Sequence, residues 1–97
     1  MSNRPSRMVC LTAVASYLEQ EFPGHVKAAK DNGFVISHEG LDHQVVLDPS
    51  FLKQCPDYTY ALHETELADY VRESRSQARR FLVMWHGHDT RIRSMSL

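Results

Sequence analysis

The Asn32-Gly33 pair is the feature that most constrains how this chain can fold. It lies between two segments with strand-like composition, and both of its residues tolerate the positive φ of a tight hairpin. A second chain reversal is indicated at Glu39-Gly40-Leu41, because a β-branched run follows at once. We therefore expect three consecutive strands in the middle of the chain, at about residues 25–30, 34–38 and 43–47.

An amphipathic helix is predicted ahead of these strands. Apolar residues recur at helical spacing, while acidic residues and a glutamine occupy the opposite side. The apolar positions are Leu11, Val14, Leu18 and Phe22. Pro23-Gly24 ends this helix, because proline cannot continue it. Residues 1–7 are expected to form a flexible lead-in.

Two helices are expected after the third strand. Asp48-Pro49-Ser50 has the composition of a helix start, with a capping aspartate and proline in the first helical position. Cys55-Pro56-Asp57 ends this short helix. A second helix begins near His63, with its acidic residues first and its arginines last, as the helix dipole favours. Its apolar stripe consists of Leu67, Tyr70 and Val71.

The segment 74–86 has two interpretations. As a helix, it would continue the preceding element and align three arginines on one side. As a strand, residues 81–85 form a short apolar run that ends before a glycine. We favour the strand because Ser74-Arg75-Ser76 is a poor helix interior. A turn at 86–89 then leads into a last strand at residues 90–93.

These elements predict one small α+β domain that spans residues 1–97. We expect an antiparallel sheet of four to five strands packed against an N-terminal helix and a middle helix, in the order α-β-β-β-α-α-β-β. The composition is 42% hydrophobic and 24% charged, which is close to the globular average and argues against disorder. Trp85 is expected to be largely buried, because it ends the most apolar run of the C-terminal half.

The apolar run at residues 8–18 follows two arginines, as in an export signal. Cleavage at the small residues 13–15 would leave an apolar core shorter than the roughly 7–15 residues that such a signal needs. The run is also shorter than the roughly 20 residues of a membrane span. We therefore expect a cytoplasmic protein without membrane association, in which Cys10 and Cys55 are reduced thiols.

His86-Gly87-His88-Asp89 is the tightest cluster of potential metal ligands. Two ring nitrogens and a carboxylate on one turn could ligate zinc, with Cys10, Cys55 or His63 completing the shell. Structural zinc sites usually consist of two close ligand pairs, and this chain has no second pair with that spacing. We expect an exposed polar turn, with no metal and no cofactor.

Three histidines provide an alternative, catalytic interpretation. His38 and His43 flank the second turn with two acidic residues between them, and a histidine next to a carboxylate is a common general acid–base arrangement. An enzyme of this class would use His38, His43 and His63, with the C-terminal arginines holding an anionic substrate. The usual hydrolase, phosphate-loop and zinc-protease motifs do not accompany them. We therefore expect a non-catalytic domain and assign no catalytic residue.

Residues 33–71 have a layout that bears on this alternative. Gly33-Phe34 comes first, Gly40 follows with His43 close behind, and residues 58–63 precede a helix. In this order the segment resembles the small HicA-type RNA-cleaving toxins. Those toxins carry Gly-Ser-His, whereas this chain has Gly40-Leu41-Asp42-His43 and further strands after the helix. The resemblance implies a small histidine-dependent, RNA-cleaving hydrolase as the alternative function.

Basic residues gather in the last part of the chain. Residues 1–70 contain five Lys/Arg and ten Asp/Glu, whereas residues 71–97 contain six arginines and two acids, a local balance of +4 in a chain of net charge −1. The planar guanidinium group is well suited to recognition of phosphate and carboxylate. The binding residues that we predict are Arg72, Arg75, Arg79, Arg80, Arg91 and Arg93.

These arginines predict a binding or regulatory domain that engages an anionic macromolecular partner. The pI of about 6.6 is well below that of dedicated nucleic-acid binders, so an acidic protein is favoured over a nucleic acid. A homodimer between acidic and basic parts of two copies is one alternative. A solvated helix end and a charged edge strand that discourages sheet pairing would account for the same residues without a partner.

Overall fold

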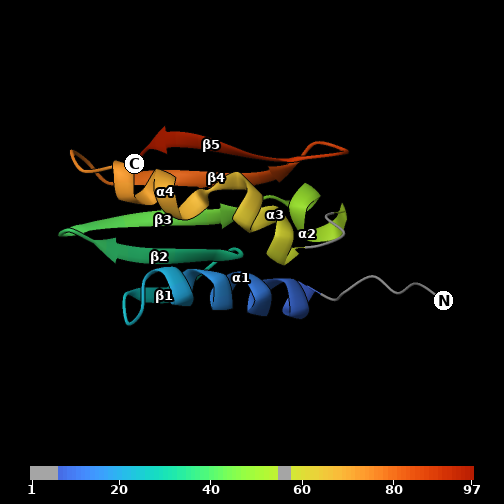
Figure 1. Ribbon diagram of the computed structural model, residues 1–97, viewed down its shortest axis with the longest axis horizontal. Coiled ribbons are helices and arrows are strands. Elements are labelled where there is room, and N and C mark those ends of the chain that lie inside the picture. The colour runs from blue at the N-terminus through green and yellow to red at the C-terminus, as the bar shows by residue number, and fades with distance from the viewer. Residues whose placement is uncertain (1–6, 55–57) are drawn as a thin grey trace.

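The computed structural model describes the backbone of residues 7–54 and 58–97, and the side chains of residues 9–53 and 61–97. This part of the chain forms a five-stranded sheet and four helices, so the predicted α+β fold is confirmed (Figure 1). The elements are α1 (Arg7–Glu21), β1 (Val26–Ala29), β2 (Gly33–His38), β3 (Leu41–Leu47), α2 (Pro49–Gln54), α3 (Tyr58–Thr65), α4 (Leu67–Glu73), β4 (Arg79–Trp85) and β5 (Thr90–Ser96). The ambiguous segment 74–86 therefore contains a strand.

The five strands lie in the order β1-β2-β3-β4-β5, and the sheet is mixed. Three neighbouring pairs are antiparallel, but β3 and β4 are parallel. The expectation of a wholly antiparallel sheet is therefore wrong at this one pair. The reason is the connection, because α2, α3 and α4 lie between β3 and β4, and a long helical crossover returns the chain in the same direction.

The first hairpin turns one residue earlier than the Asn32-Gly33 pair indicates. Asp31 and Asn32 have the positive φ values, 58° and 60°, whereas Gly33 is already the first residue of β2. A Cβ atom on Gly33 would lie 3.2 Å from the carbonyl oxygens of Lys30 and Val45. Close backbone approach, and not a positive φ, therefore favours glycine at position 33.

Three other residues with positive φ shape the middle of the chain. Glu39 (φ 53°) and Gly40 (φ 80°) form the two-residue turn between β2 and β3, at the predicted position. Glu66 (φ 56°) separates α3 from α4. The helix predicted from near His63 is therefore two helices, and the first of them already begins at Tyr58. A left-handed residue cannot continue a right-handed helix, which explains the break.

The start of α2 is capped as the sequence predicts. One carboxylate oxygen of Asp48, Oδ2, accepts hydrogen bonds from the backbone N–H of Ser50 (2.9 Å) and from its hydroxyl (2.6 Å). These bonds lower the pKa of Asp48. The Ser50 hydroxyl oxygen also accepts the backbone N–H of Trp85 at 3.1 Å, which ties α2 to the end of β4. Trp85 itself is only partly buried, because it lies at the margin of the core.

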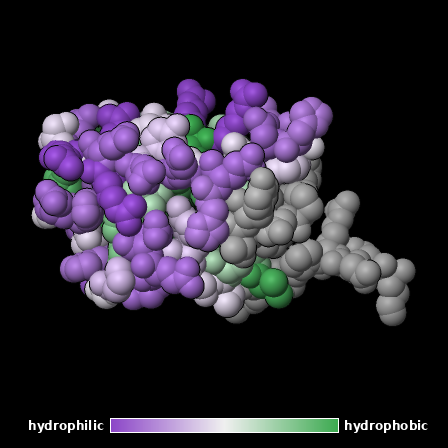
Figure 2. Space-filling model, viewed as in Figure 1, coloured by the Kyte–Doolittle hydropathy of each residue, from purple (hydrophilic) through white to green (hydrophobic). Residues whose placement is uncertain are grey.

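The helices pack on one face of the sheet, the side nearer the viewer in Figure 1. Phe34, Ile36, Val45 and Leu47 point from the strands into the core, as their alternation predicts. Side chains of the helices complete this core, among them Val14, Leu18, Phe22, Phe51, Leu62, Leu67 and Val71. The outer surface of the helix side is largely hydrophilic (Figure 2).

Three further expectations concern the N-terminal lead-in, the two cysteines and membrane spans. Arg7, the last residue of the expected lead-in, begins α1, whereas residues 1–6 lie outside the described residues. Cys10 is buried in the core, and Cys55 lies outside the described residues. No helix in the described part of the chain has the length and apolar character needed to cross a membrane.

Candidate functional site

The face of the sheet opposite the core is covered by no described helix, and it carries apolar and basic side chains side by side. We call it the open face. Strand residues alternate between the two faces, so residues that flank the core positions belong to it. Its larger side chains, which the strand register brings into neighbouring positions, are Lys27, Val35, Ser37, Asp42, Gln44, Val46, Arg80, Leu82, Met84, Arg91, Arg93 and Met95.

Apolar and charged members of the open face differ in exposure. The apolar side chains are half-buried by their neighbours: Val35, Val46, Leu82, Met84 and Met95. The cations are exposed: Lys27, Arg80, Arg91 and Arg93. The open face is therefore an aliphatic surface with positively charged groups standing above it, an arrangement that accepts both apolar contacts and charge-assisted hydrogen bonds.

Three of the predicted arginines lie together on the open face. Arg93 pairs with Leu82 across β4 and β5, and Arg91 pairs with Met84. Arg80 pairs with Gln44, whose side-chain oxygen accepts a hydrogen bond from Nε of Arg80 at 3.1 Å.

These three arginines make only weak electrostatic interactions within the molecule. Arg91 makes an exposed ion pair of 3.5 Å with Asp89, a contact worth about 0–1 kcal/mol. Arg93 forms no ion pair with any residue that the structure describes. Arg80 has the neutral amide of Gln44 as its partner. A carboxylate or phosphate that binds these arginines would therefore break only weak interactions within the molecule.

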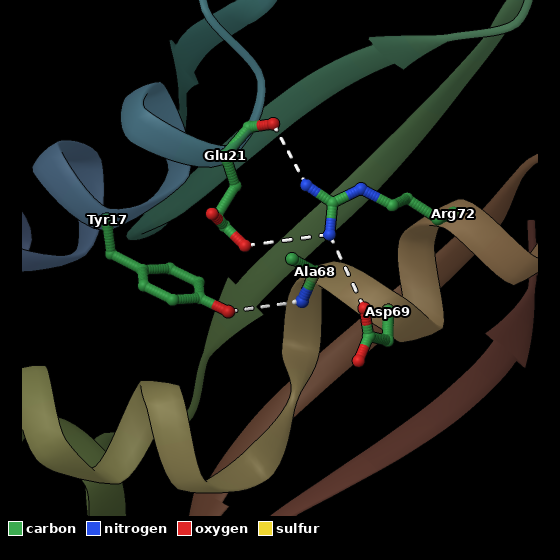
Figure 3. Close-up of polar contacts among 5 residues, drawn as sticks. All are labelled: Tyr17, Glu21, Ala68, Asp69 and Arg72. Atoms are coloured by element: carbon green, nitrogen blue, oxygen red, sulfur yellow. Dashed lines mark hydrogen bonds and ion pairs between the residues drawn. The ribbon is translucent and has the colours of Figure 1, made fainter.

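Arg72 is engaged inside the molecule instead (Figure 3). Its Nη1 lies 3.6 Å from a carboxylate oxygen of Glu21 and 3.4 Å from one of Asp69, and its Nη2 donates to the Glu21 carbonyl at 3.2 Å. The guanidinium carbon also lies 4.9 Å from the centre of the Phe22 ring. Arg72 therefore holds α4 against the C-terminal end of α1.

The remaining two predicted arginines lie away from the open face. Arg75 is exposed in the loop after α4, where its Nε donates to the Arg72 carbonyl at 3.4 Å. Arg79 begins β4 with its side chain on the helix side of the sheet, and its Nε donates to the hydroxyl of Ser94. The structure thus divides the six arginines into a group of three on the open face and three elsewhere.

The three histidines of the catalytic alternative have different surroundings. His63 on α3 packs edge-on against Tyr17, with 5.0 Å between ring centres. His38 on β2 packs edge-on against Phe22 at 5.4 Å. His43 on β3 is fully buried. The cavity beside α1 and two smaller cavities beside Tyr70 have no histidine in their walls.

His43 has an unusual environment for a polar side chain. Its Nδ1 accepts the backbone N–H of Arg79 at 3.1 Å, and its Nε2 is buried without a hydrogen-bond partner among the described residues. Burial lowers the pKa of His43, and the nearby His38 lowers it further, while the Ser74 carbonyl and Asp42 oppose the shift. Burial and the hydrogen bond from Arg79 therefore favour the neutral form of the ring.

One cavity and the β4–β5 turn bear on the catalytic and metal-binding alternatives. A cavity of about 430 Å³ lies between α1 and the β1–β2 hairpin, with a mainly apolar wall that includes Leu11, Ala15 and Phe34 but no histidine. His86 and His88 are exposed in the β4–β5 turn. Among the residues that the structure describes, no group of three His, Cys, Asp or Glu side chains is placed to hold a metal ion.

Sequence reasoning identified the arginines of the open face but missed its apolar members. The sequence shows which residues alternate within each strand. It does not show the register between β3, β4 and β5, which brings Val46, Leu82, Met84 and Met95 onto one face. Comparison with known proteins adds nothing to this geometry, because no family model, no curated protein and no solved structure matches the chain. The open face is therefore the principal guide to function.

Proposed function

We propose that this chain is a small non-catalytic binding domain that engages an anionic macromolecular partner through Arg80, Arg91 and Arg93. The single observation that carries the proposal is their gathering on the uncovered face of the sheet, above half-buried aliphatic side chains. Arginine donates paired hydrogen bonds to carboxylate or phosphate, and charge-assisted bonds of this kind are stronger than neutral ones. An acidic protein is the favoured partner, and a cytoplasmic location is part of the proposal.

The proposal retains three of the six arginines that the sequence predicts as binding residues. Arg72 already has two carboxylates and an aromatic ring as partners, so we assign it to the stability of the domain. Arg75 and Arg79 lie outside the open face, so we assign them no role in binding. The histidine-dependent hydrolase, the alternative function, would need His38, His43 and His63 around one pocket, and no observation favours it over binding.

Titration with two anionic polymers, poly-L-glutamate and poly-uridine, tests the proposal. The full chain is expected to bind at least one of them, with an affinity that falls as salt rises, because exposed charges are screened. Substitution of both Arg91→Gln and Arg93→Gln should weaken binding by about tenfold, which corresponds to about 1.4 kcal/mol.

A second double variant provides a charge-matched control. Lys53→Gln with Arg75→Gln also removes two positive charges, but from exposed positions outside the open face. It should bind the polymers nearly as well as the wild type. Equal weakening by both double variants, or no binding of either polymer by the wild type, would contradict the proposal and leave these arginines as solubilising surface.

A further inference from the structure

The apolar part of the open face is aliphatic. Val46 and Leu82 lie opposite each other on β3 and β4, and Met84 follows on the same face of β4. Protein sheets that bind single-stranded nucleic acids use aromatic side chains as stacking platforms for bases. The aromatic residues of β4, Phe81 and Trp85, lie on the opposite face. Aliphatic and thioether side chains instead fit the apolar side chains of a protein partner.

The charge of the open face argues against a second copy of the same face as its partner. Asp42 is the single carboxylate among the described strand residues of this face, and it accepts a hydrogen bond from Ser37 at 2.7 Å at the edge of the surface. Face-to-face association of two copies would bring arginines together. Pairing of two β5 edges about a two-fold axis would likewise bring together the Arg91 and Arg93 side chains of both copies, and like charges in such positions are destabilising.

The spacing of the apolar side chains fits a helix that lies along β4. Alternate residues on a strand are about 6.7 Å apart, close to the rise of about 6 Å between residues i and i+4 of a helix. Leu82 and Met84 would therefore contact successive turns. A helix about 10 Å wide covers two strand spacings of about 4.8 Å, so its sides reach β3 and β5. Val46 lies on the first side, and Arg91 and Arg93 lie on the second.

We infer that the open face binds an amphipathic helix of an acidic partner protein. Its apolar residues, spaced at i, i+3 or i+4 and i+7, pack on Val46, Leu82 and Met84, and carboxylates along one side pair with Arg91 and Arg93. Flexible methionine side chains adapt to such an apolar stripe. The inference rests on the proposed function and goes beyond it by specifying the partner's secondary structure and the arrangement of its charges.

Two fluorescein-labelled peptides of identical composition test this inference. The first places leucines at i, i+3, i+4 and i+7 with glutamates beside them, and the second contains the same residues in an order without helical periodicity. Anisotropy titration of the full chain should give a dissociation constant for the first peptide that is about tenfold lower or more. The reason is that only the first presents a continuous apolar stripe together with its charges.

Variants of the open face separate the two contributions. Leu82→Thr with Met84→Gln should remove the preference for the amphipathic peptide and leave the weaker, salt-sensitive binding of both peptides. Arg91→Gln with Arg93→Gln should weaken both peptides alike. Circular dichroism and thermal unfolding of each variant verify that it is folded. Retention of the full preference by the folded Leu82→Thr/Met84→Gln variant would contradict the inference.

Failure of the inference is distinguishable from failure of the proposed function. Equal affinity for both peptides, with the arginines still required, overturns the inference and keeps an anionic partner. Tighter binding of poly-uridine than of the amphipathic peptide also overturns it, in favour of a nucleic acid. Self-association in analytical ultracentrifugation that the peptide fails to displace assigns the face to a second copy. No binding of either peptide or of poly-uridine overturns both proposals.

Discussion

The backbone N–H of Arg79, the first residue of β4, donates a hydrogen bond of 3.1 Å to Nδ1 of the fully buried His43 on β3. The parallel pairing of the two strands begins with the next residues, Gln44 and Arg80, so this side chain extends the contact between β3 and β4 by one position. The bond requires an unprotonated Nδ1, which places the ring proton on Nε2. Protonation of His43 would remove this acceptor and leave a charge in the core.

The stability of the domain should therefore decrease in mild acid. The pKa of His43 is lowered in the folded protein, whereas in the unfolded chain it has its ordinary value of about 6.5. The unfolded chain then binds more protons, so the free energy of unfolding falls as the pH drops below about 6.5 towards the folded pKa. Urea unfolding at about pH 7.5 and pH 5.5 measures this loss.

Two variants isolate the contribution of His43. His43→Gln retains an acceptor near the Arg79 N–H but cannot titrate, so its unfolding midpoint should change less with pH than that of the wild type. His88→Gln, in the exposed β4–β5 turn, should behave like the wild type. The same pH dependence in His43→Gln and in the wild type would exclude His43 as its source.

Gly33→Ala should destabilise the domain by about 1–3 kcal/mol. The added methyl group would lie 3.2 Å from two backbone carbonyl oxygens, those of Lys30 and Val45, and neither can move without disturbing the hairpin. Asn32→Gly is the control, because Asn32 has a positive φ of 60° that glycine adopts without strain. Chemical denaturation of both variants measures the difference, and a fully stable Gly33→Ala protein would refute the close-approach argument.

Tyr17→Phe should cost about 1–3 kcal/mol of stability. The Tyr17 hydroxyl oxygen accepts the backbone N–H of Ala68 at 3.2 Å, in the first turn of α4 (Figure 3). The phenylalanine variant would leave this buried donor without a partner. Tyr70→Phe, at a side chain that is 45% exposed, should change the free energy of unfolding by less than about 0.5 kcal/mol. Comparable losses in the two variants would show that the Ala68 contact is unimportant.

The faces of the strands and the second hairpin could be predicted because their signals are local. Strand alternation assigns Phe34, Ile36, Val45 and Leu47 to one side, and Glu39-Gly40 supplies a turn wherever the flanking strands pair. The parallel pairing of β3 with β4 could not be predicted in this way. It depends on the path of three intervening helices, including the break at Glu66.

The sequence alone also could not predict which arginines lie on the open face and which lie elsewhere. Arg72 and Arg93 are the same residue type in one basic segment, and composition treats them alike. Their difference arises from tertiary position, because α4 carries Arg72 to two carboxylates of the helix side, while the β4–β5 register carries Arg93 to the open face. A strand register shifted by one residue would have placed Arg93 on the other side of the sheet.

Arg72 should accordingly contribute to stability and not to binding. Arg72→Gln removes the contacts with Glu21 and Asp69 and the stacking on Phe22, and its partly exposed position limits the cost to about 1 kcal/mol. Affinity for the acidic amphipathic peptide should stay within about twofold of the wild type, since Arg72 lies away from the open face. Arg93→Gln should show the reverse, with unchanged stability and weaker binding. Urea unfolding and peptide titration of both variants provide the measurement, and a large loss of affinity in Arg72→Gln would shift the binding surface to the helix side.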